Sequence, residues 1–162
     1  MTDKIKYAII GAGCMGQEHI LNIEIIEDAE VVALCDTSEQ SIKESLELLN
    51  NEVVIFEDYN ELVRANIADA FIIATPNFTH IDVLKDVMKS EAHLLIEKPL
   101  CTTVKDCQEF EELSKNYPGV IWTAMEYRYM PPVQRMIQEI HNKTIGDLKM
   151  LSIREHRFPF LH

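Results

Sequence analysis

The fold of this chain is decided by residues 7–19, which read YAIIGAGCMGQEH. An apolar run ends in three glycines with the spacing G-x-G-x-x-G, and a helix-like pattern follows. We interpret the stretch as a strand, a tight turn and a helix N-terminus. Gly11 would allow the turn, Gly13 would let the backbone approach a pyrophosphate, and Gly16 would let the helix pack close to the strand. The free N–H groups and the helix dipole favour an anion there, although the glycine spacing alone also fits a plain strand-to-helix turn.

Asp36 supports binding of a dinucleotide. It follows the second apolar run, residues 31–35, and lies 20 residues after Gly16, the spacing expected of the acid that binds a ribose. A carboxylate there accepts hydrogen bonds from both ribose hydroxyls and repels a 2′-phosphate. Residues 37–39 supply no Arg or Lys to hold that phosphate, so NAD is favoured over NADP. The alternative role for Asp36 is that of a helix cap.

Apolar strands alternate with amphipathic helices through most of the chain. We predict strands at residues 5–10, 31–35, 53–56, 70–74, 93–96 and 119–126. We predict helices at residues 14–26, 38–50, 59–64, 104–116 and 132–142, and one from Asn77 or Thr79 to about residue 90. Strands that are apolar throughout indicate a parallel sheet covered on both faces. The sequence therefore predicts an α/β fold, a Rossmann doubly wound parallel sheet that forms an NAD-binding domain at residues 1–126.

The last part of the chain follows a different pattern. From residue 146 to about residue 157 apolar and polar residues alternate, which is typical of a half-exposed strand. The chain then ends in FPFLH, without a closing helix. We therefore expect residues 127–162 to be the start of a truncated C-terminal α+β domain, in either a natural fragment or a truncated chain.

Composition excludes several classes of protein. The formal net charge is −12 and there is no run of Lys or Arg, which disfavours a nucleic acid or an anionic membrane as partner. No stretch approaches the roughly 20 apolar residues that span a bilayer, and the N-terminus runs directly into a strand without a leader. We expect a cytoplasmic protein. The four cysteines form no C-x-x-C pair, so we expect reduced thiols and no metal site.

Two further segments follow predicted strands, where ligands bind in such sheets. Residues 74–80 read ATPNFTH after the fourth strand, and residues 97–100 read EKPL after the fifth. Together with the glycine loop they resemble the glucose–fructose oxidoreductase / inositol dehydrogenase / rhizopine catabolism (Gfo/Idh/MocA) family, over residues 5–150. Residues 128–131 and 145–147 also resemble the family's passage between its two domains. The sequence SEAH at residues 90–93 departs from the Gly-Lys-His common in the family, but this touches no motif residue.

The resemblance implies roles for individual residues. Lys98 corresponds to the catalytic lysine that contacts the reacting hydroxyl or carbonyl of the substrate and helps to move its proton, and a lysine desolvated in a cleft suits such work. Glu97 would lie by the nicotinamide ribose and hold Lys98 in place, and Pro99 would follow a cis peptide bond. The alternative for Glu97 and Lys98 is a surface ion pair.

The resemblance also implies which residues contact the cofactor. The glycine-loop residues Gly11, Gly13, Cys14, Met15 and Gly16 would hold the pyrophosphate. Thr75, Pro76, Asn77 and His80 would line the path from the adenosine to the nicotinamide, with a cap or packing role as the alternative for His80. Arg128 would meet the nicotinamide carboxamide or an anionic substrate, with an interdomain salt bridge as its alternative.

We therefore predict a nicotinamide-dependent oxidoreductase that acts on the CH–OH group of a sugar, cyclitol or related polyol, with hydride passing to NAD. This chain would carry the cofactor-binding half. The resemblance implies a downstream Asp and His that assist Lys98, and a homo-oligomer where the second domain is present. Two alternatives stay open: a non-catalytic NAD-sensing regulator of the same fold, and a methyltransferase-like enzyme, which would not explain residues 97–99.

Overall fold

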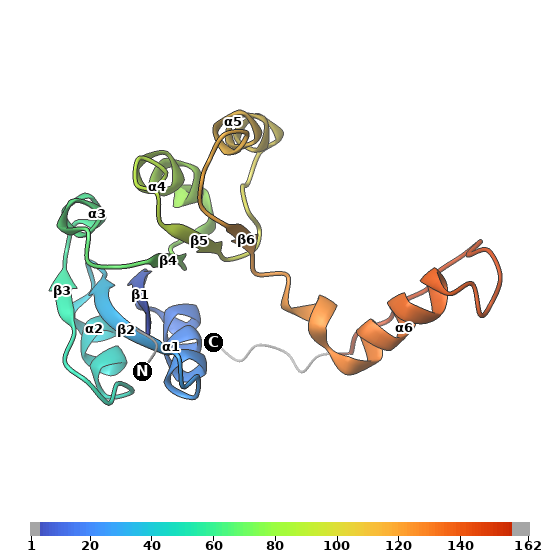
Figure 1. Ribbon diagram of the computed structural model, residues 1–162, viewed down its shortest axis with the longest axis horizontal. Coiled ribbons are helices and arrows are strands. Elements are labelled where there is room, and N and C mark those ends of the chain that lie inside the picture. Colours follow the sequence, from blue (N-terminus) through green and yellow to red (C-terminus); the bar gives the residue numbers. More distant parts are fainter. Residues whose placement is uncertain (1–3, 157–162) are drawn as a thin grey trace. The chain divides into compact units, whose positions relative to one another are not determined.

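A computed structural model describes residues 4–156 of the chain. These residues form two compact units, which divide between Ala124 and Met125. The first unit holds a parallel sheet with the strand order β3-β2-β1-β4-β5-β6 (Figure 1). The strands are β1 (Ile5–Ile10), β2 (Ala29–Cys35), β3 (Val54–Phe56), β4 (Ala70–Ile73), β5 (His93–Ile96) and β6 (Ile121–Thr123). The predicted doubly wound Rossmann sheet is therefore confirmed.

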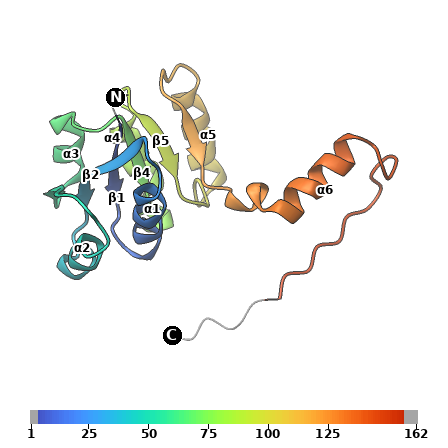
Figure 2. The same ribbon diagram turned by 60° about the horizontal axis from the view of Figure 1, so that its bottom comes forward.

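Helices cover both faces of this sheet. They are α1 (Cys14–Glu24), α2 (Glu39–Leu46), α3 (Tyr59–Ala65), α4 (His80–Val87) and α5 (Val104–Ser114). The helices α1 and α2 lie on one side of the sheet, and α3, α4 and α5 lie on the other (Figures 1 and 2). None of the helices in residues 4–156 has the length and apolar character needed to span a bilayer.

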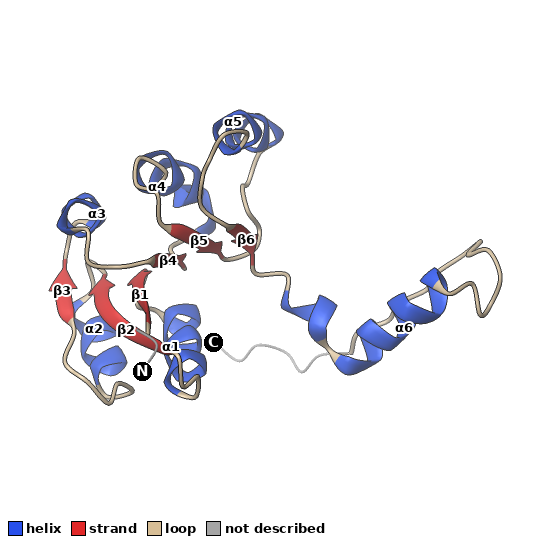
Figure 3. Cartoon of the chain, viewed as in Figure 1, coloured by secondary structure: helices blue, strands red, loops and turns tan. Residues whose placement is uncertain are grey.

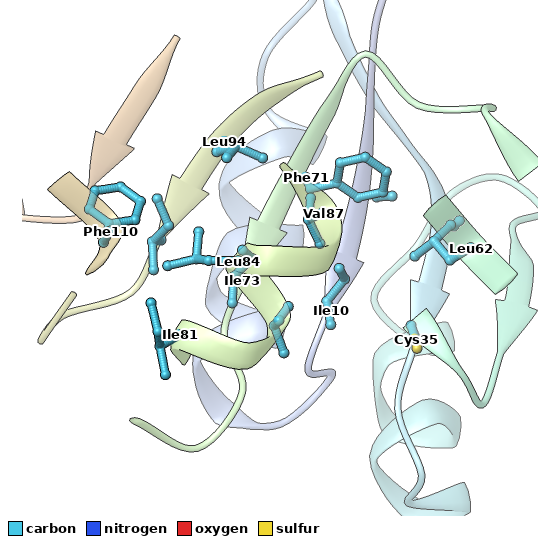
Figure 4. Packing of buried hydrophobic residues seen from close by; sticks show 14 residues of the cluster. Ile10, Cys35, Leu62, Phe71, Ile73, Ile81, Leu84, Val87, Leu94 and Phe110 are labelled. Carbon is cyan, nitrogen blue, oxygen red and sulfur yellow. The ribbon is translucent and has the colours of Figure 1, made fainter. Parts of the chain in front are cut away.

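Two apolar cores result because successive strand residues point to opposite faces. In β1, Ile9 enters one core while Ala8 and Ile10 enter the other. The core toward α1 contains the buried side chains of Ile9, Ile20, Ile23, Ala29, Val31, Leu34 and Ile72. The core toward α3, α4 and α5 is built around Ile10, Leu62, Phe71, Ile73, Leu84, Leu94 and Phe110 (Figure 4). Burial on both faces explains why β4 and the carboxyl-terminal halves of β1 and β2 are apolar without alternation.

Side-chain caps fix where several helices begin. Ser38 accepts a hydrogen bond from the N–H of Ser41 at 3.2 Å, and Thr103 accepts one from the N–H of Asp106 at 3.1 Å. The helix predicted from Asn77 or Thr79 begins with the 3₁₀ turn η1 (Asn77–Thr79), and Thr79 is the N-cap residue of α4, although its side chain makes no capping hydrogen bond. The Thr79 hydroxyl instead donates to Pro76 O and lies 2.8 Å from Thr75 Oγ1.

The second unit contains the 3₁₀ turn η2 (Glu126–Tyr129) and the helix α6 (Pro131–His141). The strand predicted from residue 146 is wrong as far as residue 156, where the chain is drawn as loop (Figure 3); residue 157 lies outside the described residues. A strand needs a neighbour to receive its backbone hydrogen bonds, and residues 125–156 contain no other strand. The apolar side chains of this segment accordingly stay exposed; Met150, for example, is 84% exposed.

Candidate functional site

A cavity of about 590 Å³ lies at the carboxyl ends of β1, β2 and β4. The chain runs from β1 outward to β3 on one side and from β4 outward to β6 on the other, so the strand order reverses between β1 and β4. Such a switch point is where ligands bind in open α/β sheets. The cavity is lined by Ile10, Gly11, Gly13, Cys14, Met15, Cys35, Asp36, Thr37, Glu57, Tyr59, Ala74, Thr75, Pro76, Thr79 and Val83.

The three glycines of the loop differ in the space that the chain leaves for a side chain. Gly11 has φ +98°, and a Cβ placed there would lie 2.6 Å from the carbonyl carbon and oxygen of Ala74. A Cβ on Gly16 would overlap the carbonyl oxygen of Gly11. A Cβ on Gly13 would meet nothing within 4 Å. The packing of the chain thus excludes a side chain at positions 11 and 16, whereas at Gly13 it leaves space open in front of the N-terminus of α1.

Ala12, between the first two glycines, is held by both of its backbone polar groups. Its N–H donates to Asp36 Oδ2 at 2.7 Å. Its carbonyl oxygen accepts from Ser45 Oγ at 3.0 Å and from Gln17 Nε2 at 3.3 Å. Ser45 is fully buried at 0% exposure. The loop is therefore held in shape by Asp36, which directly follows β2, and by side chains of α1 and α2.

Ser45 is a site residue that the sequence did not suggest. The signal that could have found it is a serine between apolar residues of one helix, since Ile42 and Leu46 flank it in α2. A hydroxyl in such a position is buried only when it has a hydrogen-bond acceptor, and here that acceptor is the carbonyl of Ala12.

Asp36 lies at the end of the cavity where we expect the adenosine of the cofactor to bind. Its Oδ1 accepts from the N–H of Ser38 at 2.8 Å, while its Oδ2 accepts from Ala12. A carboxylate oxygen has two lone pairs, so each oxygen keeps an acceptor position after these bonds. The helix cap of α2 is Ser38 rather than Asp36. Asp36 is thus bound to the loop and retains the capacity to accept hydrogen bonds from a ligand.

Carboxylates predominate at this end of the cavity, where Asp36 and Glu57 lie in its wall, while Lys43 lines an adjoining hollow. Burial, together with the nearby carboxylates of Asp36 and Asp58, raises the pKa of the Cys35 thiol to about 12. Glu57 lines the same cavity, and no Lys or Arg is among its lining residues. The site therefore suits a ribose with free hydroxyl groups and disfavours a 2′-phosphate.

Residues 97–99 lie at the end of β5. Glu97 is only 6% exposed; its Oε1 lies 2.9 Å from His19 Nε2, and its Oε2 accepts from the N–H of Lys98 at 3.2 Å. Lys98 is exposed, and its ammonium makes no ion pair with a carboxylate of residues 4–156. The surface ion pair with Glu97 is therefore not formed, and this unit does not provide the cleft expected to desolvate Lys98. The cis peptide bond before Pro99 is confirmed.

The residues after β4 divide into two groups. Thr75 and Pro76 line the cavity, whereas Asn77 is exposed at the start of η1 and is not among the lining residues. His80 is fully buried, with Nδ1 2.9 Å from the carbonyl oxygen of Pro99 and Nε2 3.0 Å from that of Thr75. Its ring thus lies behind the cavity wall, where it connects the loop after β4 with the loop after β5.

Arg128 belongs to the second unit. It lies in η2, exposed, and lines a hollow of about 510 Å³ together with Pro131, Gln134, Arg135, Ile137 and Gln138. All of these residues come from η2 and α6, so the hollow is a feature of the second unit by itself.

Comparison with known proteins relates this geometry to a family. Residues 5–125 match the model of the Gfo/Idh/MocA family, described as an oxidoreductase family with an NAD-binding Rossmann fold. A myo-inositol 2-dehydrogenase from Thermotoga maritima is 27% identical over 149 residues, which cover 92% of this chain and 44% of that protein. Glycosyl hydrolase family 109 protein 1 from Akkermansia muciniphila is 31% identical, over 90% of this chain and 32% of that protein.

Solved structures show the same fold. The scyllo-inositol dehydrogenase of Lactobacillus casei with bound NAD(H) and scyllo-inositol superposes with a TM-score of 0.82 at 22% identity, over 90% of this chain and 43% of that one. The chain thus spans less than half the length of the relatives it matches first.

Proposed function

Because the chain belongs to the Gfo/Idh/MocA family of oxidoreductases with an NAD-binding Rossmann fold, we propose that it forms the NAD-binding part of a polyol dehydrogenase. The substrate is a CH–OH group of a sugar, cyclitol or related polyol. The observation that carries the proposal is the open position at Gly13, in front of the N-terminus of α1 and in one cavity with the anchored carboxylate of Asp36.

The described residues fit the cofactor. Free backbone N–H groups and the positive end of the helix dipole lie at the start of α1, where Gly13 leaves room for a pyrophosphate. Asp36 accepts hydrogen bonds from ribose hydroxyls with the lone pairs left over from Ala12 and Ser38. Thr75 and Pro76 line the way from there toward β5. The chemistry that a bound NAD would supply is that of a hydride acceptor for the substrate carbon.

Lys98 handles the proton. Its Nζ is exposed at the end of β5; as a neutral amine it takes the proton of the substrate hydroxyl and becomes an ammonium, and in the reverse direction the ammonium returns that proton to the carbonyl oxygen. Glu97 lies beside it as a buried acceptor whose carboxylate is fixed by His19 and by the Lys98 N–H. We assign to Glu97 a contact with the nicotinamide ribose.

The relatives support the substrate class. Inositol dehydrogenases from several Salmonella strains are 27% identical to this chain over 154 residues, and a glucose-6-phosphate 3-dehydrogenase from Bacillus subtilis is 26% identical over 151 residues. These names belong to proteins more than twice as long as the matched region. Turnover is accordingly proposed for the whole protein, and cofactor binding for this chain.

Two measurements test the proposal. Calorimetry of the chain with NAD and NADP should show NAD binding with a dissociation constant roughly between 1 μM and 1 mM, and weaker NADP binding. In the full-length protein, Lys98→Met should lower polyol oxidation about 10²- to 10⁴-fold, whereas Lys105→Met, an exposed lysine of α5, should not. Absence of NAD binding contradicts the cofactor assignment. A protein that binds NADH but oxidises no polyol in a substrate panel is a regulator rather than an enzyme.

A further inference from the structure

The main chain around Lys98 is held on both sides by histidines from different helices. On one side, His19 of α1 contacts the side chain of Glu97. On the other, His80 at the start of α4 contacts the carbonyl oxygen of Pro99. Lys98 itself, exposed between these two residues, forms no ion pair within residues 4–156. The point from which its side chain extends is therefore set by its backbone, which is held by the end of β5, where the Glu97 N–H donates to Ile73 O at 2.9 Å, and by the contacts of the two histidines.

His19 gives the buried carboxylate of Glu97 its side-chain partner. The two side chains are 17% and 8% exposed, and Nε2 lies 2.9 Å from Oε1. A carboxylate with so little access to water requires compensation by donors. Glu97 finds one donor in the ring of His19 and a second in the N–H of Lys98, one on each oxygen. Because His19 lies in α1, this contact links Lys98 to the helix whose N-terminus faces the cavity.

His80 makes a different kind of link. Both of its ring nitrogens face carbonyl oxygens, those of Pro99 and Thr75. A carbonyl oxygen only accepts, so the ring must act as donor; a neutral ring donates to one of them and an imidazolium to both. Since the side chain is fully buried, water cannot replace either contact. The ring thus joins the loop that carries Lys98 to the loop that lines the cavity.

We propose that His19 and His80 are positioning residues for Lys98. Through His19 the Lys98 backbone is tied to the glycine-loop helix, and through His80 it is tied to Thr75, so that a cofactor held by these two elements meets a lysine whose backbone position is fixed. This inference rests on the proposed role of Lys98 as the proton carrier, but its structural part can be tested without turnover.

The structural test measures the backbone order of Lys98 by ¹⁵N relaxation of the chain. In the unsubstituted chain the Lys98 N–H should have an order parameter of about 0.85, and in His19→Ala or His80→Ala it should fall below about 0.6. His19→Gln should recover most of the loss, because the amide of Gln also donates to Glu97. His141→Ala, an exposed histidine of α6, is the control and should leave Lys98 unchanged. An unchanged Lys98 order parameter in both alanine variants overturns the proposal.

The kinetic test uses the full-length protein. Loss of positioning should lower kcat about 10- to 100-fold with little change in KM for NAD, and His19→Gln should restore kcat. If kcat stays the same although the Lys98 N–H becomes mobile, the positioning holds and the proton-carrying role of Lys98 fails. The two proposals are thereby separated.

The buried position of His80 calls for a second variant. If His80→Ala does not fold, His80→Gln, which keeps a donor for one carbonyl, should show an intermediate order parameter at Lys98. The ring nitrogens provide a further check by ¹⁵N spectroscopy. His19 must carry its hydrogen on Nε2 to donate to Glu97, and an Nε2 without hydrogen contradicts the contact.

Discussion

The two ends of the proposed site are built in different ways. At the glycine-loop end, the loop is held by other residues of the chain. Asp36 and Ser45 bind the backbone of Ala12, and Gly11 and Gly16 are packed against backbone atoms. At the lysine end, the neighbours of Lys98 are held by His19 and His80, while its own ammonium is exposed and forms no ion pair within residues 4–156.

The difference implies that the glycine-loop end serves cofactor binding and the lysine end serves the reaction. A loop that is fixed in advance loses little conformational freedom when a ligand binds, so the glycine-loop end suits affinity. At the lysine end the backbone is held but the ammonium of Lys98 is exposed, so this side chain can move to contact a substrate. Substitutions at the first end should accordingly change stability or affinity, whereas substitutions at the second should change turnover.

The largest expected effect is that of Gly16→Ala on stability. The added Cβ would overlap the carbonyl oxygen of Gly11, and both atoms belong to backbone that cannot rotate away. Overpacking of this kind costs about 3 kcal/mol of the free energy of unfolding, which urea denaturation of the chain would measure. A loss below about 0.5 kcal/mol, the range of neutral surface changes, would show that the loop is not held as tightly as these contacts imply.

Gly13→Ala should weaken NAD binding while it changes the free energy of unfolding only slightly. A Cβ at this position meets no atom within 4 Å, so the free energy of unfolding should fall by less than about 1 kcal/mol, the usual size of a cap effect. The methyl group occupies the space in front of the N-terminus of α1, and we expect the dissociation constant for NAD to rise about 10-fold or more, equal to about 1.4 kcal/mol. Calorimetry would measure it, with Gly16→Ala as the matched glycine. Unchanged affinity would place the pyrophosphate elsewhere.

Local patterns predicted the strands and helices and the glycine turn between β1 and α1 well, and the reason is physical. Strands buried on both faces are apolar throughout, so β1, β2 and β4 are visible as short apolar runs. The glycine loop is visible because the chain cannot accommodate a Cβ at Gly11 or Gly16. These requirements act on neighbouring residues, and the sequence displays them directly.

Contacts between distant residues were not predictable in the same way. The Glu97 carboxylate makes no ion pair with the Lys98 ammonium; it accepts from the Lys98 N–H and contacts His19, 78 residues earlier in the chain. Ser45 holds Ala12 across 33 residues. Neither pair leaves a local periodicity. The strand expected from residue 146 failed for a related reason: alternation indicates an amphipathic segment, but a strand also needs a neighbour with which to pair.

The smallest expected effect concerns Cys35 and the acidity of the glycine-loop end. The pKa of this thiol is raised from 9.0 to about 12 in the folded chain, first by burial and then by Asp36 and Asp58. The folded state therefore keeps its proton where the unfolded state loses it, and the stabilisation is complete below pH 9 and is lost as the pH rises toward 12. Between pH 8 and 9.5 the free energy of unfolding should fall by somewhat less than about 1 kcal/mol through this thiol.

Cys35→Ala isolates that contribution. The substitution removes a buried sulfur and so lowers stability at every pH, but only the unsubstituted chain should lose the additional part above pH 8, so the difference between the two chains should shrink as the pH rises. Other thiols titrate equally in both chains and cancel. A difference that stays constant from pH 7 to 9.5 would mean that neither burial nor the carboxylates of Asp36 and Asp58 raise the pKa of the Cys35 thiol in the folded chain.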